Sequence, residues 1–335
     1  MKKYLIINHS IDFGNITLEN NLKNFFRKIM YFYTFNRLNN KLKFQKSEIS
    51  KFFKSFKLRK QIKKYKNSKI IFNSIGPASW AYGSYNFKDS ILWIDWIQSL
   101  ENYINKKKIS KNFKYFLQKK ILNNMPLILC RTHILKKHLI KDYKIDHKKI
   151  RILEAPFIFE KFAQKPNITS NKPKVLFIGK DFNRKGGNFL LENLKKIKDK
   201  CDITIISNIQ KLSDVNVIKH VKFCSAKHLD ILKKHDIFFF PSKFDPYGMV
   251  IPEAMSSSLA IITCKSVLGA QNYIKNNING IICDKPDHCI IELEKLLENI
   301  PKINFLKKNA YNSMKLKHNS LVIKDEILKK ISFYD

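Results

Sequence analysis

Short apolar runs alternate with longer amphipathic segments along almost the whole chain of 335 residues. In the first half these runs are Tyr4–Asn8, Ile70–Asn73, Ile91–Ile94, Leu127–Cys130 and Ile150–Leu153. In the second half they are Val175–Gly179, Ile203–Ser207, Val221–Cys224, Ile237–Phe240, Ala260–Cys264 and Gly280–Cys283. Continuous apolar runs of this length are typical of buried parallel strands, and the segments between them are long enough for helices. The alternation therefore predicts an α/β protein with parallel sheets.

A polar segment with two prolines, Phe162–Lys174, separates the two sets of runs. A chain of this length can form two domains of ordinary size, each with its own core. We therefore expect an N-terminal domain at residues 1–162, a C-terminal domain at residues 163–320 and a final helix within residues 321–335.

The formal net charge of +37 is extreme and implies an anionic partner, such as a membrane surface, a lipid-linked phosphate or nucleic acid. The sequence is also rich in Lys, Ile, Asn and Phe, which AT-rich codons favour, so part of the charge reflects genomic composition. The basic residues occur in every segment and form no recognised nucleic-acid motif. The charge alone leaves a nucleic-acid-binding protein as an alternative, although no nucleic acid is expected.

No apolar stretch is long enough to span a bilayer, and the start of the chain reads as a first strand rather than a signal peptide. The six cysteines lack CxxC spacing and mostly fall on predicted strands, so we expect buried free thiols in a reducing cytoplasm. No His/Cys cluster has zinc spacing and no Asp-x-Asp pair occurs, so no metal site and no cofactor are expected.

The stretch 240–255, FPSKFDPYGMVIPEAM, places a strand end, a turn and the start of a helix in succession. The first N–H groups of a helix lack internal partners and its dipole favours negative charge, so this arrangement favours an anionic ligand. Two carboxylates, Asp245 and Glu253, flank the spot. Carboxylates facing such a site accept hydrogen bonds from hydroxyls, as on a sugar or a ribose.

A second stretch, 175–191, reads VLFIGKDFNRKGGNFLL. A predicted strand ends at Gly179, a polar loop follows, and Lys185 precedes two glycines at the start of a helix. Glycines let the backbone approach a ligand closely, and a lysine at a helix start can neutralise a phosphate. The pattern indicates a phosphate site.

Together these stretches resemble the signature of the family 4 retaining glycosyltransferases of GT-B fold. In that signature two acids separated by seven residues bracket a Phe/Tyr-Gly turn, as Asp245 and Glu253 do here, although the first acid is usually Glu. The loop 266–270 and Asn279-Gly280 match further landmarks, so the resemblance covers about residues 174–284. It implies two Rossmann-like domains whose parallel sheets face each other across a cleft, and a last helix, Leu321–Ile331, that returns to the first domain.

The resemblance also assigns roles around the donor's phosphates. Lys185 would hold the nucleotide diphosphate and stabilise its charge as the glycosidic bond breaks. Arg184 or Lys180 would supply a second cation, and Gly179 begins the loop that carries them. The alternative for Lys185 is an ordinary surface lysine.

For the rest of the donor, the resemblance implies that Glu253 binds the ribose hydroxyls. Asp245, together with the backbone N–H groups of Tyr247, Gly248 and Met249, would hold the donor sugar. The alternative is a strand-to-helix turn with two solvated acids.

The first domain resembles the family only in outline. Gly14 follows the first strand where the family carries a glycine-rich loop near the donor phosphates. Asp95, at a predicted strand end, would orient an acceptor hydroxyl or the donor sugar, or instead cap the helix that begins near Trp96. His9 either faces the cleft or is a polar residue at a strand end.

Residues 41–69 mix dense Lys and Arg with Phe and Leu at roughly helical spacing. Such a basic amphipathic helix can lie on an anionic membrane, and Ile109–Lys120 would add to the same patch. The alternative is a surface helix whose aromatic residues face the sheet.

We therefore expect a cytoplasmic, metal-independent retaining glycosyltransferase, peripheral on the inner face of the cytoplasmic membrane. It would transfer a sugar from a nucleotide-diphosphate sugar to a hydroxyl of an envelope glycan or lipid-linked acceptor. The main alternative is a non-catalytic binding subunit of the same fold.

Overall fold

The computed structural model describes residues 3–7, 13–17, 68–82, 86–104, 108, 111–155, 157, 159–222 and 224–318, and four later positions, 322, 326, 329 and 330. The chain divides into two compact units. Unit 1 consists of Met1–Pro156 and Lys324–Asp335, and unit 2 of Phe157–Ile323. The sequence pattern puts the first boundary after residue 162 and the second after residue 320.

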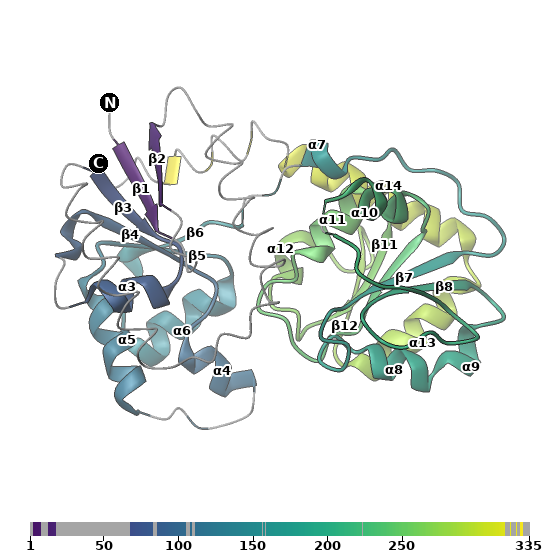
Figure 1. The fold of residues 1–335 in the computed structure, drawn as a ribbon, viewed down its shortest axis with the longest axis horizontal. Helices are drawn as coiled ribbons and strands as arrows, with labels where there is room; N and C mark the ends of the chain where they lie inside the picture. The colour runs from purple at the N-terminus through teal and green to yellow at the C-terminus, as the bar shows by residue number, and fades with distance from the viewer. Residues whose placement is uncertain are drawn as a thin grey trace. The chain divides into compact units, whose positions relative to one another are not determined.

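Unit 1 contains a six-stranded sheet in the order β2-β1-β3-β4-β5-β6 (Figure 1). Its strands are β1 (Lys3–Ile7), β2 (Phe13–Thr17), β3 (Ser68–Phe72), β4 (Ser90–Ile94), β5 (Leu127–Cys130) and β6 (Ile150–Ile152). All neighbours are parallel except β1 and β2. Its helices are α3 (Ile75–Ala81), α4 (Gln98–Ile104), α5 (Phe113–Asn124) and α6 (His133–Tyr143), with 3₁₀ turns η2 (Phe87–Asp89) and η3 (His147–Lys149).

The second strand of unit 1 corrects the expectation for Gly14. Gly14 lies inside β2 and pairs with Ile6, instead of lying in a loop. Phe13, Ile16 and Thr17 favour an extended backbone, and antiparallel pairing to β1 provides partners for the N–H and C=O groups on that side of β2.

Unit 2 contains a second six-stranded sheet, with all neighbours parallel, in the order β12-β11-β10-β7-β8-β9. The strands are β7 (Lys174–Ile178), β8 (Asp202–Ile206), β9 (Asn216–Ile218), β10 (Ile237–Phe240), β11 (Ala260–Cys264) and β12 (Ile281–Cys283). The helices are α7 (Phe159–Phe162), α8 (Gly187–Glu192), α9 (Leu194–Ile197), α10 (Ala226–Lys233), α11 (Val250–Ser256), α12 (Ala270–Tyr273), α13 (Pro286–Leu297) and α14 (Ile300–Lys317).

Both faces of the unit 2 sheet are covered, which explains why its strands are apolar without alternation. Figure 1 shows α8, α9 and α13 on one side and α10 and α11 on the other. Phe177 and Phe239 pack in a buried cluster with residues of α8, α9 and α13. Phe238 and Phe240, which flank Phe239 in β10 and point to the opposite face of the sheet, are also fully buried.

The third strand predicted for this unit, Val221–Cys224, was wrong. Its edge strand is β9 at residues 216–218, whereas Val221 and Lys222 are not in a strand. His220 and Cys224 have φ values of 55° and 56°, in the left-handed region, so this stretch cannot continue as an extended strand. It instead leads into α10, whose N-cap is Ser225.

The cysteine prediction is confirmed: all six thiols are free, and all but the half-buried Cys224 are buried. Of the basic stretch 41–69, residues 41–67 lie outside the described residues, and Ser68 and Lys69 begin β3 instead of continuing a helix. His9 and most of Leu321–Ile331 also lie outside them. Within the described parts of the chain, no helix combines the length and hydropathy that crossing a bilayer requires.

Candidate functional site

Two loops leave neighbouring strands of unit 2 and meet at one edge of its sheet. Residues 179–186 connect β7 to α8, and residues 241–249 connect β10 to α11. From β7 the chain proceeds to β8 and β9 on one side, and then returns to place β10 on the other side of β7. The two loops therefore flank the point where the strand order reverses, which is where open α/β sheets bind ligands.

The two loops are in direct contact. Gly186 has φ of +85°, and a Cβ atom added to it would lie 2.1 Å from the carbonyl oxygen of Pro241. The amide of Lys243 donates to the carbonyl oxygen of Arg184 at 2.9 Å. Only glycine permits both the left-handed backbone and this close approach, so the glycine after Lys185 fixes how the two loops join.

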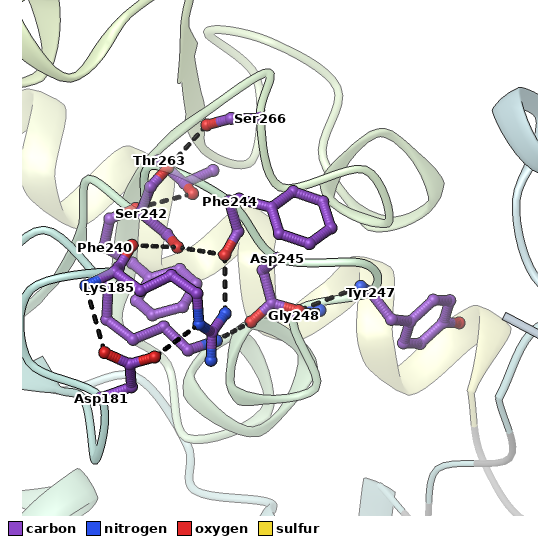
Figure 2. Close-up of polar contacts among 11 residues, drawn as sticks. Asp181, Lys185, Phe240, Ser242, Phe244, Asp245, Tyr247, Gly248, Thr263 and Ser266 are labelled. Carbon is purple, nitrogen blue, oxygen red and sulfur yellow. Dashed lines mark hydrogen bonds and ion pairs between the residues drawn. The ribbon is translucent and has the colours of Figure 1, made fainter. Parts of the chain in front are cut away.

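Lys185 and Asp245, which the sequence assigns to phosphate and sugar, form an ion pair with each other (Figure 2). The Nζ of Lys185 donates to Oδ2 of Asp245 and lies 5.1 Å from the centroid of the Phe240 ring. The side chains of Lys185 and Asp245 are 16% and 13% exposed. Both side chains are thus mostly buried, and their charges are partly desolvated.

The other oxygen of Asp245 organises its own loop. Oδ1 accepts hydrogen bonds from the amides of Tyr247 at 3.0 Å and Gly248 at 2.7 Å. Gly248 has φ of +73°, as a turn of this kind requires. Burial raises the pKa of Asp245, but Lys185 and the two amides outweigh it, and the net pKa is lowered. Asp245 is therefore a carboxylate that is fully engaged in this structure.

A third loop, between β11 and α12, is hydrogen-bonded to the backbone of Asp245. The amide of Asp245 donates to the carbonyl of Ser266 at 3.1 Å, and the amide of Leu268 donates to the carbonyl of Asp245 at 2.9 Å. Ser266 Oγ also donates to the carbonyl of Ser242 at 2.6 Å. The loop 266–270, which the resemblance singled out, thus fixes the backbone of Asp245.

Of the second cations, Arg184 is anchored and Lys180 is exposed. Arg184 Nε donates to Asp181 Oδ2 at 2.8 Å and its Nη1 donates to the carbonyl of Phe244 at 2.8 Å. The hydrogen bond from Arg184 lowers the pKa of Asp181. Arg184 therefore joins the two loops, whereas Lys180 follows Gly179 in the solvated part of the loop.

Glu253 lies in the first turn of α11 and is 1% exposed. The N-cap of this helix is Met249, and no side chain caps it. Tyr247 is buried, and its hydroxyl lies 2.5 Å from that of Tyr273 on α12. The second acid of the motif is therefore enclosed, in contrast to the partly accessible Asp245.

In unit 1, three polar side chains meet at the carboxyl edge of the sheet. Asn73, Asp95 and Arg131 directly follow β3, β4 and β5. Arg131 donates to Asp95 Oδ2 and to Asn73 Oδ1, both at 2.9 Å, and lies 5.5 Å from the Trp93 ring centroid. The alternative of Asp95 as a helix cap was wrong, because α4 begins only at Gln98.

The structure thus brings Lys185, Asp245 and the Tyr247-Gly248 turn together in unit 2, and places Asp95 and Gly14 in unit 1. The sequence analysis missed Arg131 and Asp181. Arg131 could have been found, because it is a basic residue directly after the buried run 127–130. Asp181 is one acid in a polar loop and carries no such signal. Over the residues the structure covers, no three His, Cys, Asp or Glu side chains are grouped to hold a metal ion.

Comparison with known proteins identifies the domain that carries the site. Residues 158–313 match the family described as "Glycosyl transferases group 1". This part of the chain, which carries the candidate site, is therefore similar to group 1 glycosyltransferases. The likeness of the chain to solved glycosyltransferase structures shows the GT-B fold. An uncharacterised glycosyltransferase of Methanocaldococcus jannaschii, MJ1607, is 24% identical over 164 residues, covering 44% of this chain and 42% of that protein. The match spans less than half of that relative's length.

Solved structures extend the GT-B likeness beyond the matched domain. HepE of Anabaena, crystallised with UDP, has a TM-score of 0.68 at 14% identity, covering 82% of this chain and 81% of HepE. A glycosyltransferase of Rickettsia africae has a TM-score of 0.66 at 15% identity, covering 99% and 97% of the two chains. At such identities the likeness shows the fold alone.

Proposed function

We propose that this protein is a retaining, metal-independent glycosyltransferase of family 4, and that its donor is a nucleotide-diphosphate sugar. The observation that carries the proposal is the position of Lys185. Lys185 lies next to glycines in the loops at the point where the strand order of the unit 2 sheet reverses. This sheet belongs to the region that matches group 1 glycosyltransferases. Solved GT-B neighbours contain UDP or UDP-glucose, which makes uridine nucleotides the first ligands to try.

The proposed reaction breaks the bond between the sugar's anomeric carbon and the diphosphate oxygen, which retains the electron pair. Lys185 and Arg184, with Lys180 at the loop entrance, neutralise the charge that develops there. Stabilisation of this kind contributes ~10²–10³ in rate per donor. The acceptor oxygen bonds to the anomeric carbon from the same face, and the leaving phosphate takes its proton. This scheme requires no protein nucleophile.

The remaining assignments concern hydroxyl groups. Glu253, on α11, binds the ribose hydroxyls. Asp245 and the Tyr247–Met249 backbone hold the donor sugar. In unit 1, Asp95 orients an acceptor hydroxyl, and Arg131 fixes the orientation of its carboxylate through the 2.9 Å bond to Oδ2.

We further propose a lipid-linked or envelope-glycan acceptor and contact with the inner face of the cytoplasmic membrane. The support comes from α5, which lies in a stretch, residues 102–141, without a single Asp or Glu. On this helix Phe113 is 82% exposed and Phe116 is 55% exposed, beside Lys114 and Lys120. Exposed aromatic rings among lysines fit an anionic lipid surface.

A non-catalytic binding subunit is the second candidate, because Asp245 stands where the family usually has Glu and is engaged by Lys185. The two candidates differ in the Asp245→Glu variant. If the natural protein is inactive, restoring the longer acid would produce activity; if it is an enzyme, the natural Asp already supports transfer.

The donor site is tested by thermal unfolding with UDP, GDP, ADP and their glucose conjugates, without added metal. A ligand at a hundred times its Kd should add about 2.7 kcal/mol to the free energy of unfolding. We expect one nucleotide to stabilise the wild type and Lys295→Met, which removes an exposed lysine of α13, but not Lys185→Met. No stabilisation by any nucleotide, or stabilisation that survives Lys185→Met, would contradict the proposal.

A further inference from the structure

The ion pair between Lys185 and Asp245 joins two groups to which the proposed function gives different ligands. Both oxygens of Asp245 are engaged within the protein: Oδ1 accepts from Tyr247 and Gly248, and Oδ2 accepts from Lys185. Lys185 cannot present its full charge to a diphosphate while this pair is intact, because the nearby carboxylate offsets it. Binding of the donor must therefore change the pair.

We infer that Asp245 is a counter-ion which Lys185 exchanges for the donor's diphosphate, so that binding of the phosphates releases Oδ2 of Asp245 to the donor sugar. The inference rests on the proposed function and adds an order of events to it. Asp245 positions Lys185 in the empty site and becomes a sugar ligand in the filled one.

The side chain of Lys185 has more conformational freedom than that of Asp245, and this difference decides which of the two moves. Asp245 is fixed by the two amides on Oδ1 and by backbone bonds on both sides to the loop 266–270. Lys185 ends in a flexible stem with three donor hydrogens, and its side chain is 16% exposed. The side chain of Lys185 therefore moves toward the phosphates, and the carboxylate of Asp245 stays in place.

Exchange is favoured over sharing because a diphosphate and a carboxylate are both anions. Held by one ammonium group, they would repel each other in a partly desolvated site. After the exchange Oδ2 of Asp245 has lost its partner, and a buried acceptor without one is costly. A sugar hydroxyl removes this cost, whereas a nucleoside diphosphate without sugar does not. The pair thus favours binding of the donor and release of the product.

The test is calorimetric titration of the full chain with UDP, and with inorganic pyrophosphate as a probe that needs no base pocket. In Asp245→Asn, the amide oxygen can still accept from Tyr247 and Gly248, but the charge opposite Lys185 is gone. We expect UDP to bind Asp245→Asn roughly tenfold more tightly than the wild type, because Lys185 no longer gives up a hydrogen bond to a charged group when it reaches the phosphates.

Two controls separate this effect from others. Asp230→Asn removes the same charge from an exposed carboxylate of α10 that pairs with Lys234, and should change the UDP affinity about twofold or less, as an exposed pair does. A damaged turn in Asp245→Asn would weaken binding, so a gain in affinity cannot come from misfolding. In Lys185→Met, which has no ammonium group to exchange, the further change Asp245→Asn should give a smaller gain in UDP affinity than it gives in the wild type.

The outcomes distinguish the inference from the proposed function. If UDP binds the wild type through Lys185, but Asp245→Asn binds it no more tightly, the exchange is wrong and the donor site stands. If Asp230→Asn gives the same gain as Asp245→Asn, general electrostatics explains it and the exchange is also wrong. If neither UDP nor pyrophosphate binds any of these proteins, the anion site is absent and both proposals fail.

Discussion

His318, the residue after α14, is buried beside the ring of Tyr273, with the two ring centroids 5.1 Å apart. Tyr273 in turn contacts Tyr247 of the candidate site through their hydroxyl groups. Burial, with a smaller contribution from Lys317, lowers the pKa of His318 to about 4. The neutral imidazole is therefore the form that packs behind the site.

We expect this histidine to make stability depend on pH. The unfolded chain takes up the proton near pH 6.5 and the folded chain near pH 4, so the stabilisation is complete above pH 6.5 and is lost as the pH falls toward 4. Between pH 7 and pH 5 the free energy of unfolding should fall by about 2 kcal/mol from this residue.

Urea unfolding at both pH values would measure this difference for the wild type, His318→Gln and His288→Gln. The first variant should lose about 2 kcal/mol of the pH dependence. The second, which removes an exposed histidine of α13, should retain all of it. An unchanged pH dependence in His318→Gln would show that His318 titrates as it does in the unfolded chain.

The sequence identified Lys185 and Asp245 individually, because each lies at a strand end within a recognisable motif. It could not show that they pair, since they are 60 residues apart and meet only because β7 and β10 are neighbours. Arg131 was missed for the same reason: its partners Asn73 and Asp95 come from two other strands.

Helix α14 is joined to the opposite, amino-terminal ends of the strands by a buried polar network. Lys307 is fully buried, and its Nζ donates to Asp236 Oδ1 at 2.6 Å and to Thr169 Oγ1 at 3.1 Å. Asp236, directly before β10, also accepts from the amide of Lys174 at 3.0 Å. One lysine thus links α14, β7, β10 and the segment that precedes β7.

We expect Lys307→Met to destabilise unit 2 by roughly 3–5 kcal/mol, because it leaves the Asp236 carboxylate buried without its cation. Lys308→Met, on the exposed neighbouring position, is the matched control and should be near neutral. Urea unfolding would measure both, and the double variant Lys307→Met/Asp236→Asn should recover part of the loss. Equal stability of the two single variants would contradict the role of the network.

Elements with a simple signal in the sequence were predicted well, and those without it were not. Buried central strands such as β10 and β11 are continuous apolar runs, and the structure confirms them. The edge strand β9 has three residues, none of them buried, so the sequence pattern predicts a strand at the more apolar run 221–224 instead. Lys307 is one lysine in a lysine-rich helix, and only the packing of α14 shows that it is buried.

At the scale of the whole molecule, the net charge of +37 should attract the protein to anionic surfaces, with the exposed rings of α5 deciding how it docks. We expect co-sedimentation with vesicles that contain phosphatidylglycerol, and little with phosphatidylcholine alone. Binding should weaken as salt rises, because screening reduces the attraction.

Phe113→Ser/Phe116→Ser should weaken vesicle binding roughly tenfold or more, since each buried ring contributes about 1.5–3 kcal/mol. Phe305→Ser is the matched control, because Phe305 is also exposed, at 48%, but lies on α14 of unit 2. If both variants bind as the wild type does, charge alone holds the protein and α5 is not the docking face.

The division into units has a consequence for synthesis. Unit 1 both begins and ends the described chain, and unit 2 is inserted between residues 156 and 324. A ribosome therefore completes unit 2, with its candidate site, before it has made the last segment that belongs to unit 1. Domains generally fold as units while the chain is produced. Unit 2 should accordingly be the first part of this protein to reach its final structure, although it comes second in the sequence.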